Sequence, residues 1–547
     1  MAGIRLWTWN FVCCVLVKTV SSQTIVNQYD WESEVSSKKG RSTYSLKNRP
    51  NIIIILADDM GWGDMGANWA ETTDTPNLDA LAKGGLRLSD LHSGASVCAP
   101  SRAALLTGRL GLRTGVVRNF GAAALGGLPR NETTFAEMLR AAGYRTAMLG
   151  KWHLGLQPGH HPLDKGFDKY LGVPYSIDMG CTDSPAANLP PCPTCPLDES
   201  ATSHRNASRV EGGCFEDLAL PLIKDRDIIH QPTNLSTLAE QYARFGEDFI
   251  LTTSEGRPFL LYAALAHVHV PLATGARFAE ASRRGPLGAA LRELDWLTGR
   301  LAKAADAARR DTLLWFLSDN GPWEAKCTLA GSAGPYLGSW QRSAAGGGGG
   351  SASKRTVWEG GHRTPSFVRW PSHVPGGRVS GALASALDVL PTLAALTGAA
   401  LPAARSLDGR DISALLLHPD PPAAPLRQVL FHPNSGAAGE QGQIGAVRVG
   451  DLKVVYFSGG AATCGGAQGP PRALRPPLVF DVGADPAEAR PLGGQVAAAA
   501  REKAARALDA LQRSVRADNT SRADYRSHRP ARPCCSSYSA VCRCLWD

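Results

Sequence analysis

The stretch Asn51-Ile52-Ile53-Ile54-Ile55-Leu56-Ala57 is a continuous apolar run that contains four consecutive isoleucines. Such a run, without polar alternation, is typical of a strand buried on both faces, as in a parallel sheet covered by helices. It ends directly in Asp58 and Asp59. Burying two adjacent carboxylates at the end of a strand costs free energy unless a positive charge lies beside them. A solvated acidic turn is the simpler alternative. The stretch predicts an α/β fold with a candidate site at this strand end.

Three further apolar runs, at 144–149, 258–265 and 312–317, are predicted strands that also end in polar residues. They lead into Lys151 and His153, into His267 and His269, and into Asp319 and Asn320, respectively. Open α/β sheets bind their ligands at the carboxyl ends of the strands. The crossover helices are expected at about 77–84, 134–142, 236–252 and 288–309.

Asp58, Asp59, Asp319 and Asn320 form an all-oxygen set of candidate metal ligands. Hard oxygen donors favour Ca²⁺ or Mg²⁺ over zinc, and we favour Ca²⁺ because it tolerates irregular ligand shells. The ion would offset the paired carboxylates and polarise an oxygen of an anionic substrate.

Four further side chains offer positive charge or proton transfer: Lys151, Lys354, His153 and His269. The lysines could hold an anion, and the histidines could move protons. Each residue alone is more simply explained as a surface lysine or a packed histidine. Their joint occurrence after predicted strands and after one glycine-rich loop favours a common site.

Cys98-Ala99-Pro100-Ser101-Arg102 continues to Leu106-Thr107-Gly108-Arg109 and predicts a helix. Pro100 suits the first helical position, and Gly108 can end the helix. Cys98 would then lie at the positive end of the helix dipole, with Arg102 one turn further on. A cysteine packed at a helix entrance is the simpler alternative.

Several motifs in this order resemble the type I sulfatases: LADDMGWGD, CAPSR with LTGR, GKWHLG, H-x-H-x-P, DNGP and K-x-T-x-W-E-G-G. The resemblance runs from about residue 50 to the C-terminus. It implies an alkaline-phosphatase-like sandwich with a large mixed, mostly parallel sheet flanked by helices. It also implies that Cys98 is oxidised to formylglycine (3-oxoalanine) by the formylglycine-generating enzyme, and that the hydrated aldehyde is the nucleophile.

The same resemblance implies a role for each site residue. Residue 98 joins the four oxygen ligands at one Ca²⁺ ion, and Arg102 activates the nucleophile. His269 protonates the leaving alcohol, and His153 helps to release sulfate. The sulfate is held by Lys151, Ser176, His269 and Lys354. The implied substrates are glucosamine 3-O-sulfate of heparan sulfate, a sulfated glycosaminoglycan, and small aryl sulfates. The implied location is the lysosome, reached through the secretory pathway, or the extracellular space.

The chain has 547 residues, with 44% hydrophobic and 20% charged residues and a net charge of +9. Residues 1–22 resemble a signal peptide, and 23–49 form a polar lead-in. We expect a catalytic domain over 50–405 and a smaller α+β subdomain over 406–547. This subdomain combines short strands at 445–449 and 452–457, a helix at 495–517 and a cysteine-rich tail. No later apolar run predicts a transmembrane helix, and no basic repeat with interleaved aromatics indicates nucleic-acid binding.

Cysteines and sequons support passage through the endoplasmic reticulum. Of 13 cysteines, ten remain after Cys13, Cys14 and Cys98 are set aside, and an even number favours disulfides. Cys192 and Cys195 could instead form half of a zinc site. Sequons begin at Asn131, Asn206, Asn234 and Asn519. We expect a disulfide-held loop at 172–215 and a flexible glycine-rich tract at 343–353.

Two other functions remain open from the sequence. A phosphatase or phosphodiesterase of the same wider superfamily would use Ser or Thr as nucleophile and usually two zinc ions; Cys98 and the Asp/Asn ligand set disfavour it. A non-catalytic protein that binds sulfated glycans is disfavoured by the complete set of reactive groups.

Overall fold

Strand β1 (Asn51–Ala57) lies at the centre of the large sheet in this computed structural model, and all of its residues are buried. Ile52, Ile54 and Leu56 pack into one hydrophobic core, while Ile53, Ile55 and Ala57 pack into a second. Successive side chains of a strand point to opposite faces, so an uninterrupted apolar run fills both cores. This burial confirms the predicted two-sided strand.

The structure describes residues 49–197, 214–215, 217–253, 256–279, 282–308, 310–403, 405–418 and 425–544. The signal-peptide interpretation of 1–22 lies outside these ranges, as does nearly all of the lead-in. The described residues form a ten-stranded mixed sheet whose strands, in spatial order, are β11 (Arg378–Ser380), β2 (Leu86–Leu88), β10 (Ser366–Arg369), β9 (Thr312–Ser318), β1, β8 (Phe259–Ala264), β4 (Arg145–Gly150), β5 (Lys169–Gly172), β6 (Leu222–Lys224) and β7 (Asp227–His230). Strands β9, β1, β8, β4 and β5 run parallel to one another.

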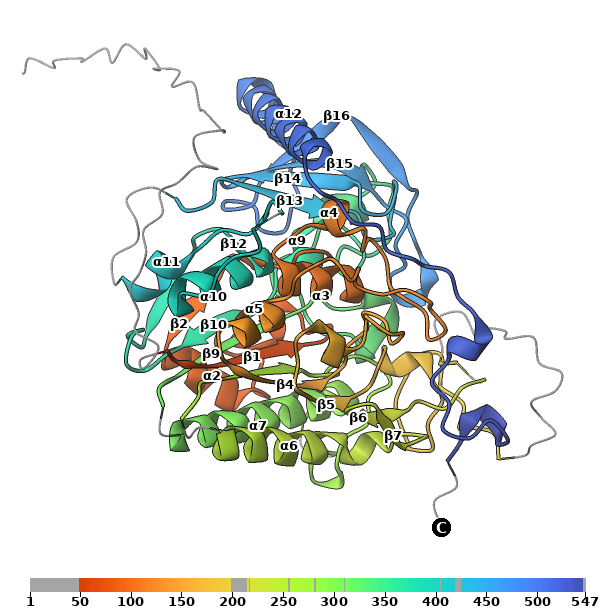
Figure 1. Cartoon of the computed structure of the whole chain (residues 1–547). Helices are drawn as coiled ribbons and strands as arrows, with labels where there is room; N and C mark the ends of the chain where they lie inside the picture. The colour runs from red at the N-terminus through yellow and green to blue at the C-terminus, as the bar shows by residue number, and fades with distance from the viewer. Residues whose placement is uncertain are drawn as a thin grey trace, which may run out of the picture. The chain divides into compact units, whose positions relative to one another are not determined.

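Helices cover both faces of this sheet (Figure 1). One face carries α2 (Pro76–Lys83), α6 (Leu238–Thr253) and α7 (Gly285–Ala307). The other carries α3 (Cys98–Thr107), α5 (Phe135–Ala141) and α10 (Val389–Thr397). The shorter elements are α4 (Gly111–Thr114), α8 (Ser339–Arg342), α9 (Glu359–His362), α11 (Ser413–Leu417), β3 (Leu91–His92) and β12 (Ala384–Ser385). The helix–sheet–helix layering confirms the predicted fold class. No helix of the described residues is both long and apolar enough to cross a membrane.

Helix α3 differs from its prediction at its start. It begins at Cys98, two residues before Pro100, and is preceded by Val97 in an extended conformation. Because the first N–H groups of a helix have no intrahelical acceptor, proline is tolerated anywhere in that first turn. Gly108 ends the helix with φ of 66°, as predicted, and its N–H donates to the carbonyl of Ala104.

A four-stranded antiparallel sheet forms the C-terminal region, in the order β13 (Val429–Pro433), β14 (Ile444–Val449), β15 (Leu452–Ser458) and β16 (Arg472–Asp481). Helix α12 (Gly494–Ala517) covers one face of it (Figure 1). Ala497, Ala500 and Ala504 of this helix pack on Val447 and Val454 of the sheet. This sheet and helix confirm the predicted smaller α+β arrangement.

All ten cysteines that remained as disulfide candidates are paired. The bonds join Cys181 to Cys195, Cys192 to Cys214, Cys327 to Cys464, Cys534 to Cys542, and Cys535 to Cys544. The two bonds within 181–214 hold the predicted loop together. Cys192 and Cys195 have different disulfide partners, so the zinc-site alternative is wrong.

The end of the glycine-rich tract 343–353 packs against the C-terminal region, which differs from the flexible tract expected. The Ser351 N–H donates to the carbonyl of Ala461 at 2.8 Å. At Gly350, with φ of 92°, a Cβ atom would lie 2.3 Å from the carbonyl oxygen of Gln468. Glycine therefore permits a close approach of two backbones here, just before Lys354.

A buried cluster of charges lies where helix α9 meets β14 and β15. Lys453 Nζ lies 3.0 Å from Glu359 Oε1 and 2.9 Å from Glu488 Oε1. Arg448 Nη1 lies 3.0 Å from Glu359 Oε2. Burial alone would raise the pKa of Glu359, but Lys453 and Arg448 hold it well below its ordinary value. The cluster couples the small sheet to the segment that carries Lys354.

We expect Lys453→Met to destabilise the protein by about 3–5 kcal/mol, because it leaves buried carboxylates without their cation. The matched control is Arg506→Met, which breaks an exposed pair with Glu502 on α12 and should cost less than about 1 kcal/mol. Urea unfolding followed by circular dichroism measures both. Equal losses for the two variants would contradict the assignment of the cluster as a structural junction.

Candidate active site

The carboxyl ends of four adjacent parallel strands meet at one edge of the large sheet, in the order β9, β1, β8 and β4. The residues that follow these strands are Asp319 and Asn320 after β9, Asp58 and Asp59 after β1, His267 and His269 after β8, and Lys151 and His153 after β4. All eight are buried. The structure therefore brings together the polar strand ends that the sequence singled out.

The acidic group is built around Asp59, whose backbone has φ of 59°. Its N–H donates to Asp319 Oδ1 at 3.2 Å, and Asn320 Nδ2 donates to Asp59 Oδ1 at 2.7 Å. Burial, reinforced by the charge of Asp58, raises the pKa of Asp319 to about 7. Asn320 Oδ1 is buried and has no hydrogen-bond partner among the described residues. An unpaired acceptor beside crowded carboxylates is an arrangement that suits a cation.

Arg102 and Lys151 neutralise two of these acids. Arg102 Nε and Nη2 lie 3.0 and 2.9 Å from Asp319 Oδ2, and its Nη1 donates to the Lys151 carbonyl at 2.7 Å. Lys151 Nζ donates to Asp58 Oδ2 at 2.6 Å. Burial alone would raise the pKa of Asp58, but Lys151 and the other nearby positive groups hold it well below its ordinary value.

Lys354 neutralises the third acid. Its Nζ lies 2.7 and 2.6 Å from the two carboxylate oxygens of Asp59. Burial lowers the pKa of the Lys354 ammonium, but Asp59, together with Cys98 and Asp58, outweighs burial and raises it. Lys354 is only 4% exposed, so it is held in the site although a glycine-rich tract precedes it. Three buried acids thus face three buried bases.

Cys98 lies among these charges at the first position of α3. It is free and 1% exposed, and its Sγ is 3.7 Å from Asp58 Oδ1. Burial raises the pKa of the thiol to about 12; Lys151 and Lys354 oppose this rise, and Asp58 and Asp319 add to it. The thiolate is the reactive form of cysteine. An unmodified Cys98 is therefore a poor nucleophile at this position.

His269 and Ser176 contact both a lysine and an acid. Ser176 Oγ accepts from Lys151 Nζ at 3.2 Å and lies 3.4 Å from His269 Nε2. His269 Nε2 also lies 3.5 Å from Asp59 Oδ2. His269 Nδ1 is 2.6 Å from the Val270 carbonyl, so this nitrogen carries a hydrogen and Nε2 faces the site. Burial lowers the pKa of the imidazole, and Lys354 lowers it further.

His153 is held in a backbone conformation with φ of 60°. Its Nε2 is 3.2 Å from the Phe120 carbonyl, so Nε2 carries the hydrogen that this bond requires. Its Nδ1 is buried and has no partner among the described residues. Burial lowers the pKa of His153 well below its ordinary value, and Lys151 and Arg102 act in the same direction. A neutral imidazole with an open acceptor results.

Three residues beside the site were not predicted: Trp323, Asp178 and Lys326. The Trp323 ring centroid is 5.6 Å from that of His269, and Lys354 Nζ lies 4.7 Å from the same ring. Lys326 Nζ is 4.4 Å from the Trp323 ring, and burial lowers the pKa of Lys326 to about 8. Trp323 and Asp178 stand within three residues of Asn320 and Ser176. That proximity was the available signal, but it does not show which side chains turn inward.

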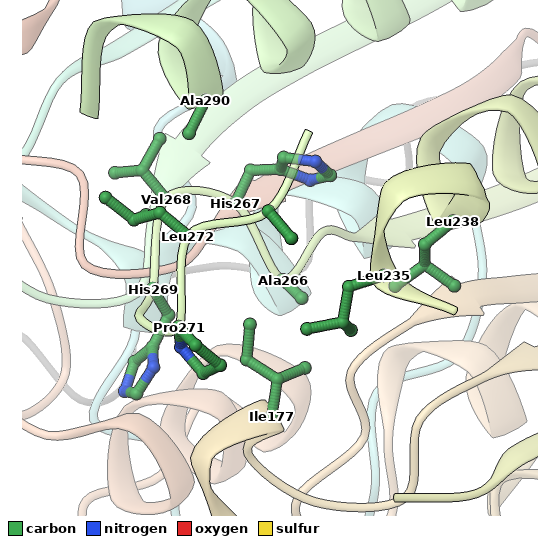
Figure 2. A pocket seen from close by; sticks show the side chains of 11 residues that line it. Ile177, Leu235, Leu238, Ala266, His267, Val268, His269, Pro271, Leu272 and Ala290 are labelled. Carbon is green, nitrogen blue, oxygen red and sulfur yellow. The ribbon is translucent and has the colours of Figure 1, made fainter. Parts of the chain in front are cut away.

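A small apolar cavity lies next to His269 (Figure 2). Its lining includes Ile177, Leu235, Leu238, Ala266, Val268, Leu272 and Ala290, with His267 and His269 on its wall. The volume of about 20 Å³ holds about one water molecule. The cavity is therefore too small for a sugar or an aryl ring, and its apolar wall serves to bury His269.

Comparison with known proteins identifies the family. Residues 50–399 match the family described as Sulfatase, and residues 426–544 match the C-terminal region of aryl-sulfatase. The chain belongs to the sulfatase family. It is a sulfuric ester hydrolase, and members of this family generally use a metal ion together with a formylglycine.

Relatives of this sulfatase match along most of their length. Arylsulfatase G of Homo sapiens is 50% identical over 500 residues, which cover 91% of this chain and 93% of the relative. Arylsulfatase A of Homo sapiens is 39% identical and covers 83% and 85%. The crystal structure of the PsFucS1 sulfatase from Pseudoalteromonas sp. has a TM-score of 0.73 at 25% identity and covers 87% of this chain and 93% of that one.

Three of the four sequons of this sulfatase fall on described residues. Asn131, Asn234 and Asn519 are exposed, as an acceptor for a glycan must be. Asn206 lies outside the described residues. Glycosylation of all four remains a prediction.

Proposed function

We propose that this sulfatase acts through residue 98 after Cys98 has been oxidised to formylglycine, with one Ca²⁺ ion beside it. The proposed substrates are glucosamine 3-O-sulfate of heparan sulfate and small aryl sulfates. One observation carries the proposal: Cys98 is buried against Asp58, and burial holds its thiol protonated. A site rich in hard oxygen ligands is poorly matched to sulfur, so an oxygen nucleophile suits it better.

The donor set fits a hard cation. Asp58, Asp59, Asp319 and Asn320 would hold Ca²⁺. Among the atoms of these side chains, Asn320 Oδ1 is buried and has no hydrogen-bond partner among the described residues, so it is available to coordinate the ion. When bound, the ion would supply positive charge to an oxygen of the substrate sulfate. Formylglycine would supply, as its hydrate, an oxygen nucleophile at position 98.

The remaining roles follow from the side chains themselves. Arg102, Lys151 and Lys354 bring positive charge that can bind the sulfate group and stabilise negative charge that develops on its oxygens. Ser176 lies between Lys151 and His269 and can orient a sulfate oxygen.

The two histidines can divide the proton transfers. His269 has its Nδ1–H fixed on the Val270 carbonyl, so its Nε2 faces the site. In the imidazolium form, Nε2 carries a proton that it can deliver to the leaving alcohol, which returns the ring to the neutral form. His153 has Nε2 fixed on the Phe120 carbonyl, so its Nδ1 can accept a proton when sulfate leaves.

The choice of a 3-O-sulfated substrate rests on the likeness to arylsulfatase G. We expect terminal glucosamine 3-O-sulfate to be hydrolysed about 10- to 100-fold faster, in kcat/KM, than the 6-O-sulfated or N-sulfated isomers, because a site that hydrogen-bonds one substrate rejects an isomer that leaves its polar groups unpaired. Sulfate release from defined heparan oligosaccharides measures this ratio, and a small aryl sulfate serves as the positive control. A preference for the 6-O-sulfated end would contradict the assignment.

Maturation and location complete the proposal. Ten paired cysteines and exposed sequon asparagines support passage through the endoplasmic reticulum, where the formylglycine-generating enzyme would act on Cys98. Delivery to the lysosome, or secretion, would follow.

A further inference from the structure

A loop at 115–128 touches the active site at two points. The Phe120 carbonyl is 3.2 Å from His153 Nε2 and fixes that imidazole. Asn119 Oδ1 accepts from the Ala99 N–H at 2.9 Å, one residue after Cys98. The position of this loop therefore sets the orientation of His153 and supports the helix end that carries residue 98.

The loop at 115–128 is held in place by the C-terminal segment 518–528, which we call the strap. Tyr525 of the strap stacks on Phe120, with ring centroids 4.8 Å apart and planes inclined by 16°. The Tyr525 hydroxyl accepts from the Val117 N–H at 2.8 Å and donates to the Gly115 carbonyl at 3.2 Å. One side chain thus binds the loop through both its ring and its hydroxyl.

Backbone pairing adds to this contact. The Leu125 N–H donates to the Arg526 carbonyl at 2.8 Å, and the His528 N–H donates to the Ala123 carbonyl at 2.9 Å. At Gly126, a Cβ atom would lie 2.3 Å from the carbonyl oxygen of Asp524. The strap and the loop are therefore in direct backbone contact along several residues.

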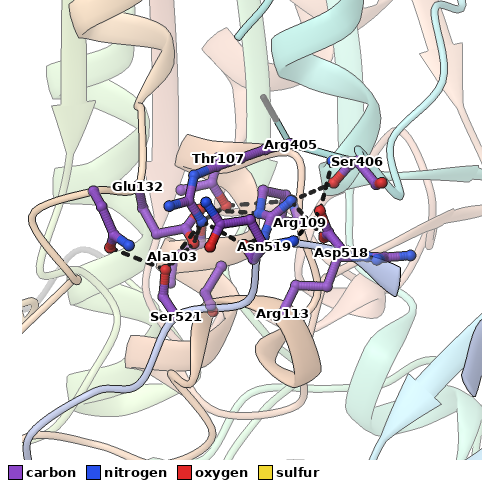
Figure 3. A network of polar contacts seen from close by, with 12 residues as sticks. Ala103, Thr107, Arg109, Arg113, Glu132, Arg405, Ser406, Asp518, Asn519 and Ser521 are labelled. Atoms are coloured by element: carbon purple, nitrogen blue, oxygen red, sulfur yellow. Dashed lines mark hydrogen bonds and ion pairs between the residues drawn. The ribbon is translucent and has the colours of Figure 1, made fainter. Parts of the chain in front are cut away.

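The start of the strap is anchored to the end of α3 by a polar network (Figure 3). Asp518 Oδ2 lies 2.9 Å from Arg109 Nη1 and 3.0 Å from Arg113 Nη1. Ser521 Oγ donates to Glu132 Oε1 at 2.6 Å. Because these groups are largely buried, the network fixes the strap to the body of the catalytic region.

We propose that Tyr525 is a positioning residue of the active site: it fixes the loop at 115–128, and through the Phe120 carbonyl it orients His153. This inference rests on the function proposed above for His153. Tyr525 touches neither substrate nor nucleophile, so its effect should fall on kcat, while the sulfate-binding groups keep KM nearly unchanged.

Two variants separate the hydroxyl from the ring. Tyr525→Phe removes the hydroxyl bonds and keeps the stacking, and we expect kcat for a small aryl sulfate to fall about 3-fold. Tyr525→Leu removes both, and we expect a fall of about 10- to 100-fold, the scale reached when a reacting group is misplaced by about 1 Å. KM should change less than about 2-fold. The matched control is Tyr538→Phe, whose ring is 93% exposed on the same C-terminal tail and should leave kcat unchanged.

A double-mutant cycle distinguishes positioning from general stability. In a His153→Ala background, Tyr525→Phe should cause no further loss of kcat, because the group through which it acts is gone. Rates are expressed per formylglycine, measured by mass spectrometry of the residue 98 peptide. Melting temperatures are recorded by circular dichroism; if Tyr525→Leu does not fold, Tyr525→Phe decides.

The outcomes are separable. The proposed function fails if the wild-type enzyme, with formylglycine present, releases no sulfate. The positioning role fails if the wild type is active and the Tyr525 variants match it, if their loss is additive with His153→Ala, or if it disappears when rates are corrected for formylglycine.

Discussion

Replacing Cys98 with alanine is expected to lower sulfate release by at least about 10⁴-fold, the scale on which removal of a catalytic nucleophile acts. The residual rate would come from Arg102, Lys151 and Lys354, which still bind and polarise the sulfate group. Stability should change little, since the variant removes one sulfur atom from a buried position; this costs about 1 kcal/mol. The measurement is kcat/KM for an aryl sulfate, alongside the melting temperature.

The sharpest control for this prediction uses the unaltered chain. Protein made in cells that lack formylglycine-generating activity keeps Cys98 as a thiol, so it differs from the mature enzyme at one side chain only. We expect it to be as inactive as Cys98→Ala, because burial holds the thiol protonated, with a pKa of about 12. Full activity of this thiol form would contradict the formylglycine proposal.

The sequence predicted the large sheet well because each of its central strands carries its own signal. The runs that became β1, β4, β8 and β9 are uniformly apolar, since both faces are covered, and each is followed at once by polar residues. Parallel pairing then brings those residues to one edge, so Asp58 and Asp319 could be placed together without knowledge of the strand order.

The start of α3 was less predictable. Pro100 favours the first turn of a helix but does not specify a position within it, because several N–H groups there lack acceptors. The extended backbone of Val97 decides the start, and that conformation is a tertiary effect.

Disulfide pairing and the inward-facing neighbours of the site also needed the structure. An even count of ten cysteines indicates disulfides but does not show which cysteines pair. The bond between Cys327 and Cys464, for example, joins residues 137 positions apart. Trp323 follows the DNGP motif, but the motif does not show that its ring lies against His269 and Lys354. Tyr525 lies about 370 residues from His153, and no local pattern connects them.

Removal of divalent cations with a chelator is expected to lower activity by about 100-fold or more, because the charge that a metal ion supplies to a substrate oxygen is worth several kcal/mol. Stability should fall as well. A ligand that binds only the folded state adds about 2.7 kcal/mol at 100 times its Kd, so the melting temperature should rise with added Ca²⁺. Mg²⁺ should act more weakly, because it demands a regular octahedral shell.

A matched pair of buried acids tests where the ion binds. Asp59→Asn removes a carboxylate that lies beside Asp319 and Asn320, and we expect the Ca²⁺-dependent rise in melting temperature to disappear. Asp64→Asn alters an equally buried acid on the same turn, but Asp64 is satisfied by Arg284 and by the N–H groups of Gly61 and Ser332. It should lower stability without changing the response to Ca²⁺. If both variants keep the response, or if Zn²⁺ restores the chelated enzyme better than Ca²⁺ does, the oxygen-ligand site cannot be a calcium site, because zinc prefers nitrogen and sulfur donors.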